Sequence, residues 1–155
     1  MFTRIFGTTT EEIKQAAEII KDGGLVAFPT ETVYGLGADA LNAEAVGKVY
    51  AAKGRPSDNP MIVHISSKDD VLKLTPKITE DMQKLMDAFW PGPLTMVVPA
   101  LDVIPKVTTG GLDTVGIRMP SESAAAELIS ASETPIAAPS ANLSGKPSPT
   151  SYKHV

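Results

Sequence analysis

The sequence predicts a single α/β domain, and three observations support that prediction. The 155 residues are 43% apolar and 21% charged, which is typical of one folded globular domain with a buried core. Short apolar runs alternate along the chain with segments of helical periodicity. The 12 Gly and 13 Pro residues indicate structured loops between them. Such alternation is typical of a sheet packed against helices.

Each element is predicted from a local pattern. Thr9 and Glu12 have the spacing of a capping box at the start of a helix, and Asn42 is a suitable N-cap for a second helix. Apolar runs that are too short for helices predict strands. Helices are expected from the Thr9 cap to the stop at Gly23, over 43–52, from Ser67–Asp70, over 79–90 and over 121–132, and strands over 25–28, 61–65, 94–98, 115–119 and 135–138.

Composition and charge exclude several classes of protein. The net charge of −4 argues against general electrostatic binding of nucleic acid. Without Cys the chain cannot form disulfides, thiolate zinc sites or a Cys nucleophile, and with two His a structural metal is not expected. Because neither a membrane-length apolar run nor a signal peptide is found, we expect a soluble, cytoplasmic protein with no membrane contact.

Residues 35–40 read GLGADA and fit a variant of the dinucleotide-binding fingerprint. The preceding strand is expected to end at Phe28, well before Gly35, and no acidic residue ends a second strand about 20 residues further on. The surroundings therefore argue against a dinucleotide site. We interpret Gly35 and Gly37 as glycines that permit a positive φ in a tight loop and bring backbone close to protein or ligand.

Two cations follow the second predicted helix. Lys53 and Arg55 lie two residues apart in a loop stiffened by Pro56, and no Walker A sequence occurs in the chain. Arg can bind phosphate oxygens with two hydrogen bonds and Lys acts as a compact charge, so the pair is suited to polyphosphate. The alternative is a solvated surface pair, and composition favours it.

His64 and Arg118 lie on predicted strands. Alternation places His64 opposite Val63, and it places Arg118 on the same face as Gly116, which leaves space above the sheet. A hydrogen-bonded core histidine and an exposed arginine are the alternatives to a ligand site.

Polar residues also follow two predicted strands. Ser140 and Asn142 come after the last strand, and Thr30 to Thr32 come after the first. Open α/β sheets commonly bind ligands beyond the carboxyl ends of their strands. Ser and Thr in turns can equally do no more than cap backbone, so this pattern alone leaves both interpretations open.

Five segments together carry a specific resemblance. PTETVYGLGADA, KGRPSDNPMIVHI, WPGPLTMVV, VGIRMP and APSANLSGKPSPT resemble, in order and spacing, the YrdC-like family, and in particular its threonylcarbamoyl-AMP synthases. The paired signature of Lys53-x-Arg55 with Ser140-x-Asn142 is its most specific part. The resemblance implies a twisted, open, mixed α/β sheet with flanking helices and a concave, positively lined ligand-binding surface.

The resemblance implies an enzyme of tRNA modification. The implied reaction is a nucleotidyl transfer in which L-threonine, bicarbonate or CO₂, and ATP give threonylcarbamoyl-AMP and pyrophosphate. Mg²⁺ is expected to accompany ATP, and a tRNA threonylcarbamoyl-transferase machinery is expected to use the product. No protein nucleophile is needed, because positioning and charge stabilisation carry such a reaction.

The same resemblance assigns residues to two substrates. It implies that Lys53 and Arg55 act at the phosphates as catalytic cations. Thr32, His64, Arg118 and the backbone at Ala138 are implied to bind threonine, and Arg55, Asn59, Thr114, Ser140, Asn142 and Ser148 are implied to bind ATP.

The resemblance also implies a longer domain, and two other functions are alternatives to the synthase. Family domains continue past the position of Val155 with further strands and another nucleotide-contacting Arg, so residues 1–155 are expected to be one YrdC-like domain truncated at its C-terminus. One alternative is a module that binds double-stranded RNA or tRNA, against which the net charge weighs. The other is a remnant that binds threonine or nucleotide without turnover.

Overall fold

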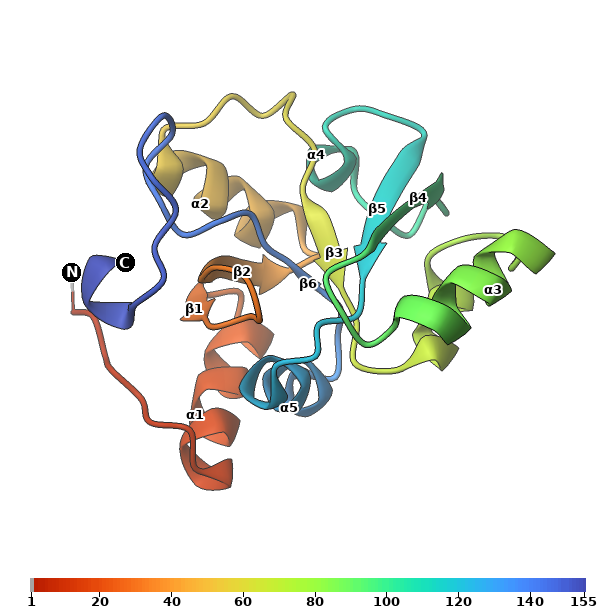
Figure 1. Cartoon of the computed structure of the whole chain (residues 1–155). Coiled ribbons are helices and arrows are strands. Elements are labelled where there is room, and N and C mark those ends of the chain that lie inside the picture. The colour runs from red at the N-terminus through yellow and green to blue at the C-terminus, as the bar shows by residue number, and fades with distance from the viewer. Residues whose placement is uncertain (1) are drawn as a thin grey trace.

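One six-stranded sheet is the framework of the chain, whose residues 2–155 are described by a computed structural model (Figure 1). Its strands are β1 (Val26–Phe28), β2 (Gly35–Asp39), β3 (Ile62–His64), β4 (Thr95–Pro99), β5 (Thr114–Arg118) and β6 (Ile136–Ala137). They lie in the order β1-β2-β6-β3-β5-β4, with β3 and β5 parallel and the other neighbours antiparallel. The sheet is mixed and open, as expected.

The helices begin where the sequence places their caps. The Thr9 hydroxyl accepts a hydrogen bond from the Glu12 N–H, and Asn42 Oδ1 accepts one from the Ala45 N–H. Gly54, with φ of 61°, ends the second helix in the left-handed conformation. The helices are α1 (Thr10–Lys21), α2 (Ala43–Lys53), α3 (Glu80–Phe89), α4 (Lys106–Thr109) and α5 (Ser123–Ser132), with the 3₁₀ helices η1 (Lys68–Lys73) and η2 (Tyr152–His154).

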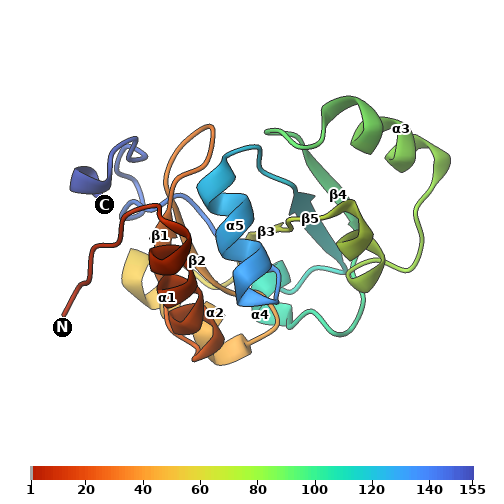
Figure 2. The ribbon, with the colours of Figure 1, turned by 90° about the horizontal axis from the view of Figure 1, so that it is seen from below.

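Helices cover the two faces of the sheet unequally. Residues paired in register across neighbouring strands share a face, so His64, Arg118 and Ile136 lie on the same side. Ile136 belongs to an apolar cluster with residues of α1 and α5, which lie side by side against this face (Figure 2). The opposite face carries a larger cluster that includes Val63 and Ile117 and residues of α2.

The face that carries Arg118 is open over β3 and β4. Ile62 lies on the same face as His64 and is 36% exposed, and Val97, which pairs with Gly116 in register, is 72% exposed. The helices α1 and α5 therefore cover one half of this face and leave the other half accessible. The candidate site lies at the edge of the region that α1 and α5 cover.

The predicted loop at Gly35 and Gly37 is instead strand β2, so the positive-φ interpretation was wrong. Neither glycine has a positive φ. A Cβ at Gly37 would lie 2.7 Å from both Ile136 Cγ2 and Phe28 Cε1, so this position needs glycine for close packing between strands. The predicted close approach of backbone to protein is confirmed.

Three expected elements differ in detail, and α4 and η2 are additional to the expected ones. The apolar run 25–28 predicts a buried strand, but β1 is an edge strand in which only Phe28 is buried, because one of its sides has no neighbouring strand within residues 2–155. The helix after Ser67 is a 3₁₀ helix. Helix α5 begins at Ser123 rather than Ser121, whose backbone N–H donates to the Glu31 carboxylate instead.

Among residues 2–155, every helix is too short or too polar to cross a membrane.

Candidate functional site

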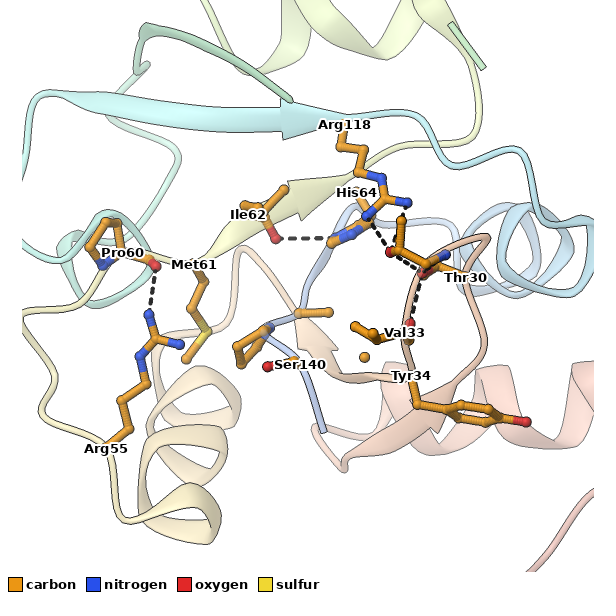
Figure 3. A pocket seen from close by; sticks show the side chains of 14 residues that line it. Thr30, Val33, Tyr34, Arg55, Pro60, Met61, Ile62, His64, Arg118 and Ser140 are labelled. Atoms are coloured by element: carbon orange, nitrogen blue, oxygen red, sulfur yellow. Dashed lines mark hydrogen bonds between the residues drawn. The ribbon is translucent and has the colours of Figure 1, made fainter. Parts of the chain in front are cut away.

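A pocket of about 300 Å³ opens on the half of the sheet face that the helices leave accessible. Its wall comes from four segments that are distant in sequence: the β1–β2 loop, the chain from the end of α2 through β3, the end of β5, and the segment after β6. Figure 3 shows Arg55 and Arg118 at opposite ends of this pocket. The lining residues are Thr30, Thr32, Val33, Tyr34, Gly35, Arg55, Pro60, Met61, Ile62, His64, Arg118, Ala138, Pro139 and Ser140.

Arg118 is the buried cation of the pocket. The residue is 8% exposed, and burial lowers the pKa of its guanidinium, which stays charged. It forms an ion pair with Glu31, and its Nη1 and Nη2 atoms lie 3.4 and 3.5 Å from Thr32 Oγ1. Its Nε atom is buried and has no hydrogen-bond partner in the described chain. A buried guanidinium with an unpaired N–H group is suited to binding a carboxylate.

His64 lies beside Arg118 as a neutral imidazole. Burial lowers the pKa of His64 to about 4. The Nδ1 atom lies 3.2 Å from Ile62 O and 3.3 Å from Ile136 O, so we place the ring proton on Nδ1, where it can donate to these carbonyls. The Nε2 atom is then a hydrogen-bond acceptor. His64 is thus both the hydrogen-bonded core histidine and a residue that lines the pocket.

The β1–β2 loop presents Thr32 to Arg118. The Thr30 hydroxyl donates to Val33 O at 2.7 Å and accepts from the Thr32 N–H at 3.2 Å. The two threonine hydroxyls lie 3.0 Å apart, so Thr32 can donate to Thr30 and accept from Arg118. Local hydrogen bonds of this kind fix the loop without regular secondary structure.

Arg55 is the second cation of the pocket and is half-buried. Its Nη2 atom donates to Pro60 O at 3.2 Å, and its Nε atom is buried without a partner among residues 2–155. Gly110 packs against the same loop, because a Cβ there would lie 2.7 Å from Asp58 O. Arg55 is therefore held at the edge of the pocket with part of its guanidinium free to bind an anion.

Lys53 does not line the pocket. It is 4% exposed, and burial and the nearby charge of Arg55 lower the pKa of its ammonium. The ammonium donates to the carbonyl of Ser140 and, at 2.7 Å, to that of Asn142, while Ser144 N–H donates to Lys53 O at 3.1 Å. Lys53 therefore joins α2 to the segment after β6. This burial rules out the solvated-pair interpretation for Lys53.

The structure brings together six of the residues predicted for the site. Thr32, Arg55, His64, Arg118, Ala138 and Ser140 line the pocket, whereas Lys53, Asn59, Thr114, Asn142 and Ser148 do not. Asn142 and Ser148 belong to the segment 139–149, which makes two main-chain hydrogen bonds with Tyr34. The Tyr34 N–H donates to Pro149 O, and the Ala141 N–H donates to Tyr34 O. Asn142 also accepts a hydrogen bond from the Ser140 hydroxyl at 2.5 Å.

Sequence reasoning missed several residues of the site. Tyr34, Pro60, Met61 and Ile62 line the pocket, but apolar and backbone contacts of this kind carry no local sequence signal. Glu31 was noted only as part of a polar turn. Its ion pair joins residues 87 positions apart, and only the pairing of strands brings them together.

Comparisons with a family model, with related sequences and with solved structures all identify the same family. Residues 18–155 match the family Sua5_yciO_yrdC, described as "Telomere recombination". The chain is 58% identical over 144 residues to Threonylcarbamoyl-AMP synthase of Pyrococcus abyssi, covering 93% of this chain and 42% of that protein. It is 36% identical to the Halorhodospira halophila protein of the same name, covering 90% of this chain and 73% of that one.

A solved structure agrees with these matches. The "Crystal structure of P. abyssi Sua5 complexed with L-threonine" superposes with a TM-score of 0.92 at 56% identity, covering 98% of this chain and 44% of that chain. The chain thus spans less than half the length of the Pyrococcus abyssi protein. The family match, the sequence identities and the superposition agree over the same residues, and the chain belongs to the Sua5/YciO/YrdC family.

Proposed function

We propose that this chain catalyses the ATP-dependent synthesis of threonylcarbamoyl-AMP from L-threonine and bicarbonate or CO₂, with release of pyrophosphate. The observation that supports this most is a single pocket with a cation at each end, Arg118 buried beside a neutral His64 and Arg55 at the rim. Such a pocket can hold two anionic groups of different substrates. The names of relatives up to 58% identical, and the threonine in the Sua5 complex, support the choice of substrates.

L-Threonine is proposed to bind at the Arg118 end. Its carboxylate would take the free Nε edge of Arg118, which is buried and offers charge-assisted hydrogen bonds. His64 Nε2 can accept from a donor of the substrate. Thr32 Oγ1 and the Ala138 carbonyl would complete the contacts. The Ala138 N–H already donates a hydrogen bond to Ile62 O.

ATP is proposed to bind at the Arg55 end. Arg55 and the Ser140 hydroxyl line this side of the pocket and would contact the phosphates. Asn59, Thr114, Asn142 and Ser148 lie outside the lining, and we propose that they contact parts of the nucleotide beyond the pocket. Lys53 would act on ATP through the Ser140–Asn142 backbone that it holds.

The proposed chemistry needs no covalent enzyme intermediate. The threonine amine loses a proton and attacks CO₂, and an oxygen of the resulting carbamate attacks the α-phosphorus of ATP as pyrophosphate leaves. Bicarbonate, where it is the source of CO₂, takes up the proton that the threonine ammonium gives up and loses water, and the proton released as the carbamate forms passes to solvent. Positioning and cationic stabilisation of the phosphates supply the catalysis.

Mg²⁺ is proposed to enter as part of the ATP substrate. Within residues 2–155, the His, Asp and Glu side chains form no group of three that could hold a metal ion. Phosphate oxygens and water are common ligands of Mg²⁺, so the donor set fits a metal that ATP carries. The product would then pass to a tRNA threonylcarbamoyl-transferase machinery in the cytoplasm.

An assay of the purified chain tests the reaction. We expect pyrophosphate release that requires both threonine and bicarbonate, together with a product of the mass of threonylcarbamoyl-AMP. Arg118→Met should abolish it, and Glu80→Gln, a change at an exposed glutamate in α3, should leave it unchanged. Pyrophosphate release that does not depend on threonine would contradict the proposal, and so would the absence of pyrophosphate release.

A further inference from the structure

We propose that Glu31 is a positioning residue that holds Arg118 ready to bind the substrate carboxylate. The inference rests on the proposed function, because it gives Arg118 the task of binding threonine. Glu31 is not among the residues that line the pocket. Its carboxylate contacts Arg118 and thereby acts on the substrate through that side chain.

The geometry makes Glu31 a brace between two segments. One carboxylate oxygen pairs with Arg118 Nη2. The other accepts hydrogen bonds from the backbone N–H and from the hydroxyl of Ser121, the latter at 2.5 Å. The β1–β2 loop, which carries Thr32, is therefore tied to the end of β5 and to the chain that leads into α5. The Glu31 side chain is 19% exposed and that of Arg118 is 10% exposed, so water screens this pair little.

The charge arrangement explains why Arg118 needs this partner. A buried guanidinium with no counter-charge is costly, and it would move toward solvent through the open pocket. Glu31 compensates the charge from outside the pocket wall and occupies Nη2. The contacts to Thr32 Oγ1 are long, at 3.4 and 3.5 Å, and Nε has no partner within residues 2–155. The guanidinium is thus fixed with an unpaired Nε–H group, and the binding site is formed before threonine arrives.

The arrangement predicts that removal of the Glu31 charge weakens threonine binding and leaves ATP binding nearly unchanged. In Glu31→Gln the side chain keeps its size and one acceptor oxygen, but it can no longer neutralise Arg118. We expect the Kd for L-threonine to rise at least tenfold, while the Kd for an unreactive ATP analogue stays within threefold of the wild-type value. Glu31→Asp keeps the charge on a shorter side chain and should recover part of the loss.

Two controls separate positioning from general damage. Ser121→Ala removes one hydrogen bond to Glu31 and leaves the ion pair, so threonine affinity should fall by less than threefold. Glu80→Gln breaks an exposed pair with Lys84 in α3 and should change nothing. Thermal melts of each variant show whether it is folded at the temperature of the titration.

A second measurement reports the position of Arg118 without threonine. The chain has three arginines, Arg4, Arg55 and Arg118, so the Nε–Hε signals in a ¹⁵N NMR spectrum can be assigned by single substitutions. We expect the Arg118 signal to be sharp and protected from solvent exchange in the wild type. In Glu31→Gln it should broaden or exchange at least tenfold faster.

The outcomes are distinct. Unchanged threonine affinity in Glu31→Gln, or an Arg118 signal that does not respond, overturns the role of Glu31 and leaves the proposed function standing. Failure of the wild type to bind threonine overturns the proposed function and this inference with it. Where Glu31→Gln does not fold, Glu31→Asp carries the test, and wild-type affinity in that variant together with an unaltered Arg118 signal overturns the inference.

Discussion

The ammonium of Lys53, at the end of α2, donates to the main-chain carbonyl of Ser140, on the segment that follows β6. The same ammonium donates to the Asn142 carbonyl at 2.7 Å, and the Ser140 hydroxyl donates to the Asn142 side chain. Lys53 thus joins the two halves of the paired signature through its buried ammonium. Arg55, two residues on, faces the pocket that these contacts help to shape.

Replacement of Lys53 should therefore affect stability as well as ATP binding. Lys53→Met leaves two main-chain carbonyls without their charged donor, and hydrogen bonds to charged groups contribute about 1.5–3 kcal/mol each. We expect a loss of about 3 kcal/mol or more in the free energy of unfolding, measured in urea, and weaker binding of an ATP analogue. Lys146→Met, at an exposed position of the same segment, is the control. Unchanged stability with reduced ATP binding would instead place the ammonium at the phosphates.

Replacement of Arg55 should reduce activity much more than it reduces stability. Its guanidinium is half-buried at the pocket rim and makes one hydrogen bond to Pro60 O, so Arg55→Ala should change stability by less than about 1 kcal/mol. Pyrophosphate release should fall at least tenfold while threonine still binds, as titration calorimetry can show. Arg55→Lys keeps the charge and should restore activity only in part, because an ammonium cannot bind phosphate with two parallel hydrogen bonds. Normal turnover in both variants would show that Arg55 is not a phosphate ligand.

His64 should make stability depend on pH. Its pKa is about 4 in the folded chain, while an ordinary imidazole has a pKa of 6.5. Between these values the unfolded chain binds the proton and the folded chain does not, so stability falls as the pH drops from 6.5 to 4. At pH 5 the cost relative to pH 7.5 is about 2 kcal/mol. The comparison is urea unfolding of the wild type and His64→Asn at both pH values, and an equal pH dependence in the two would contradict the assignment.

Gly37 should tolerate no side chain. Gly37→Ala places a Cβ 2.7 Å from Ile136 Cγ2 and Phe28 Cε1, and overpacking of this kind costs about 1–3 kcal/mol. Gly47→Ala, in α2, meets no atom within 4 Å and should stabilise the chain by about 0.5–1 kcal/mol. The two melting temperatures should therefore move in opposite directions. A Gly37→Ala variant as stable as the wild type would contradict the close packing of β2.

Local patterns in the sequence predict much of this fold and part of the site. Caps at Thr9 and Asn42 mark the true starts of two helices. Alternation along β3 and β5 correctly places His64 and Arg118 apart from their apolar neighbours, and strand pairing then brings the two together. Physical chemistry at the level of a few residues is sufficient for such features.

Other features depend on contacts that no local pattern contains. Strand β2 reads as a loop because its glycines lack strand propensity, and the close approach of Phe28 and Ile136 is what requires a glycine at position 37. The partners of Lys53 lie 87 and 89 residues away. The pair of Glu31 with Arg118 likewise forms only once the sheet is assembled.

The measurement that tests the central claim most directly is calorimetric titration of the chain with L-threonine, L-serine and L-valine, repeated with Arg118→Met. We expect threonine to bind about tenfold more tightly than serine, since one buried methyl group contributes about 1 kcal/mol or more. Arg118→Met should weaken threonine binding by at least about 30-fold, because loss of a buried charged partner costs about 2 kcal/mol or more. Threonine affinity that is equal in the wild type and Arg118→Met, or equal to that of valine, would contradict a threonine site at Arg118.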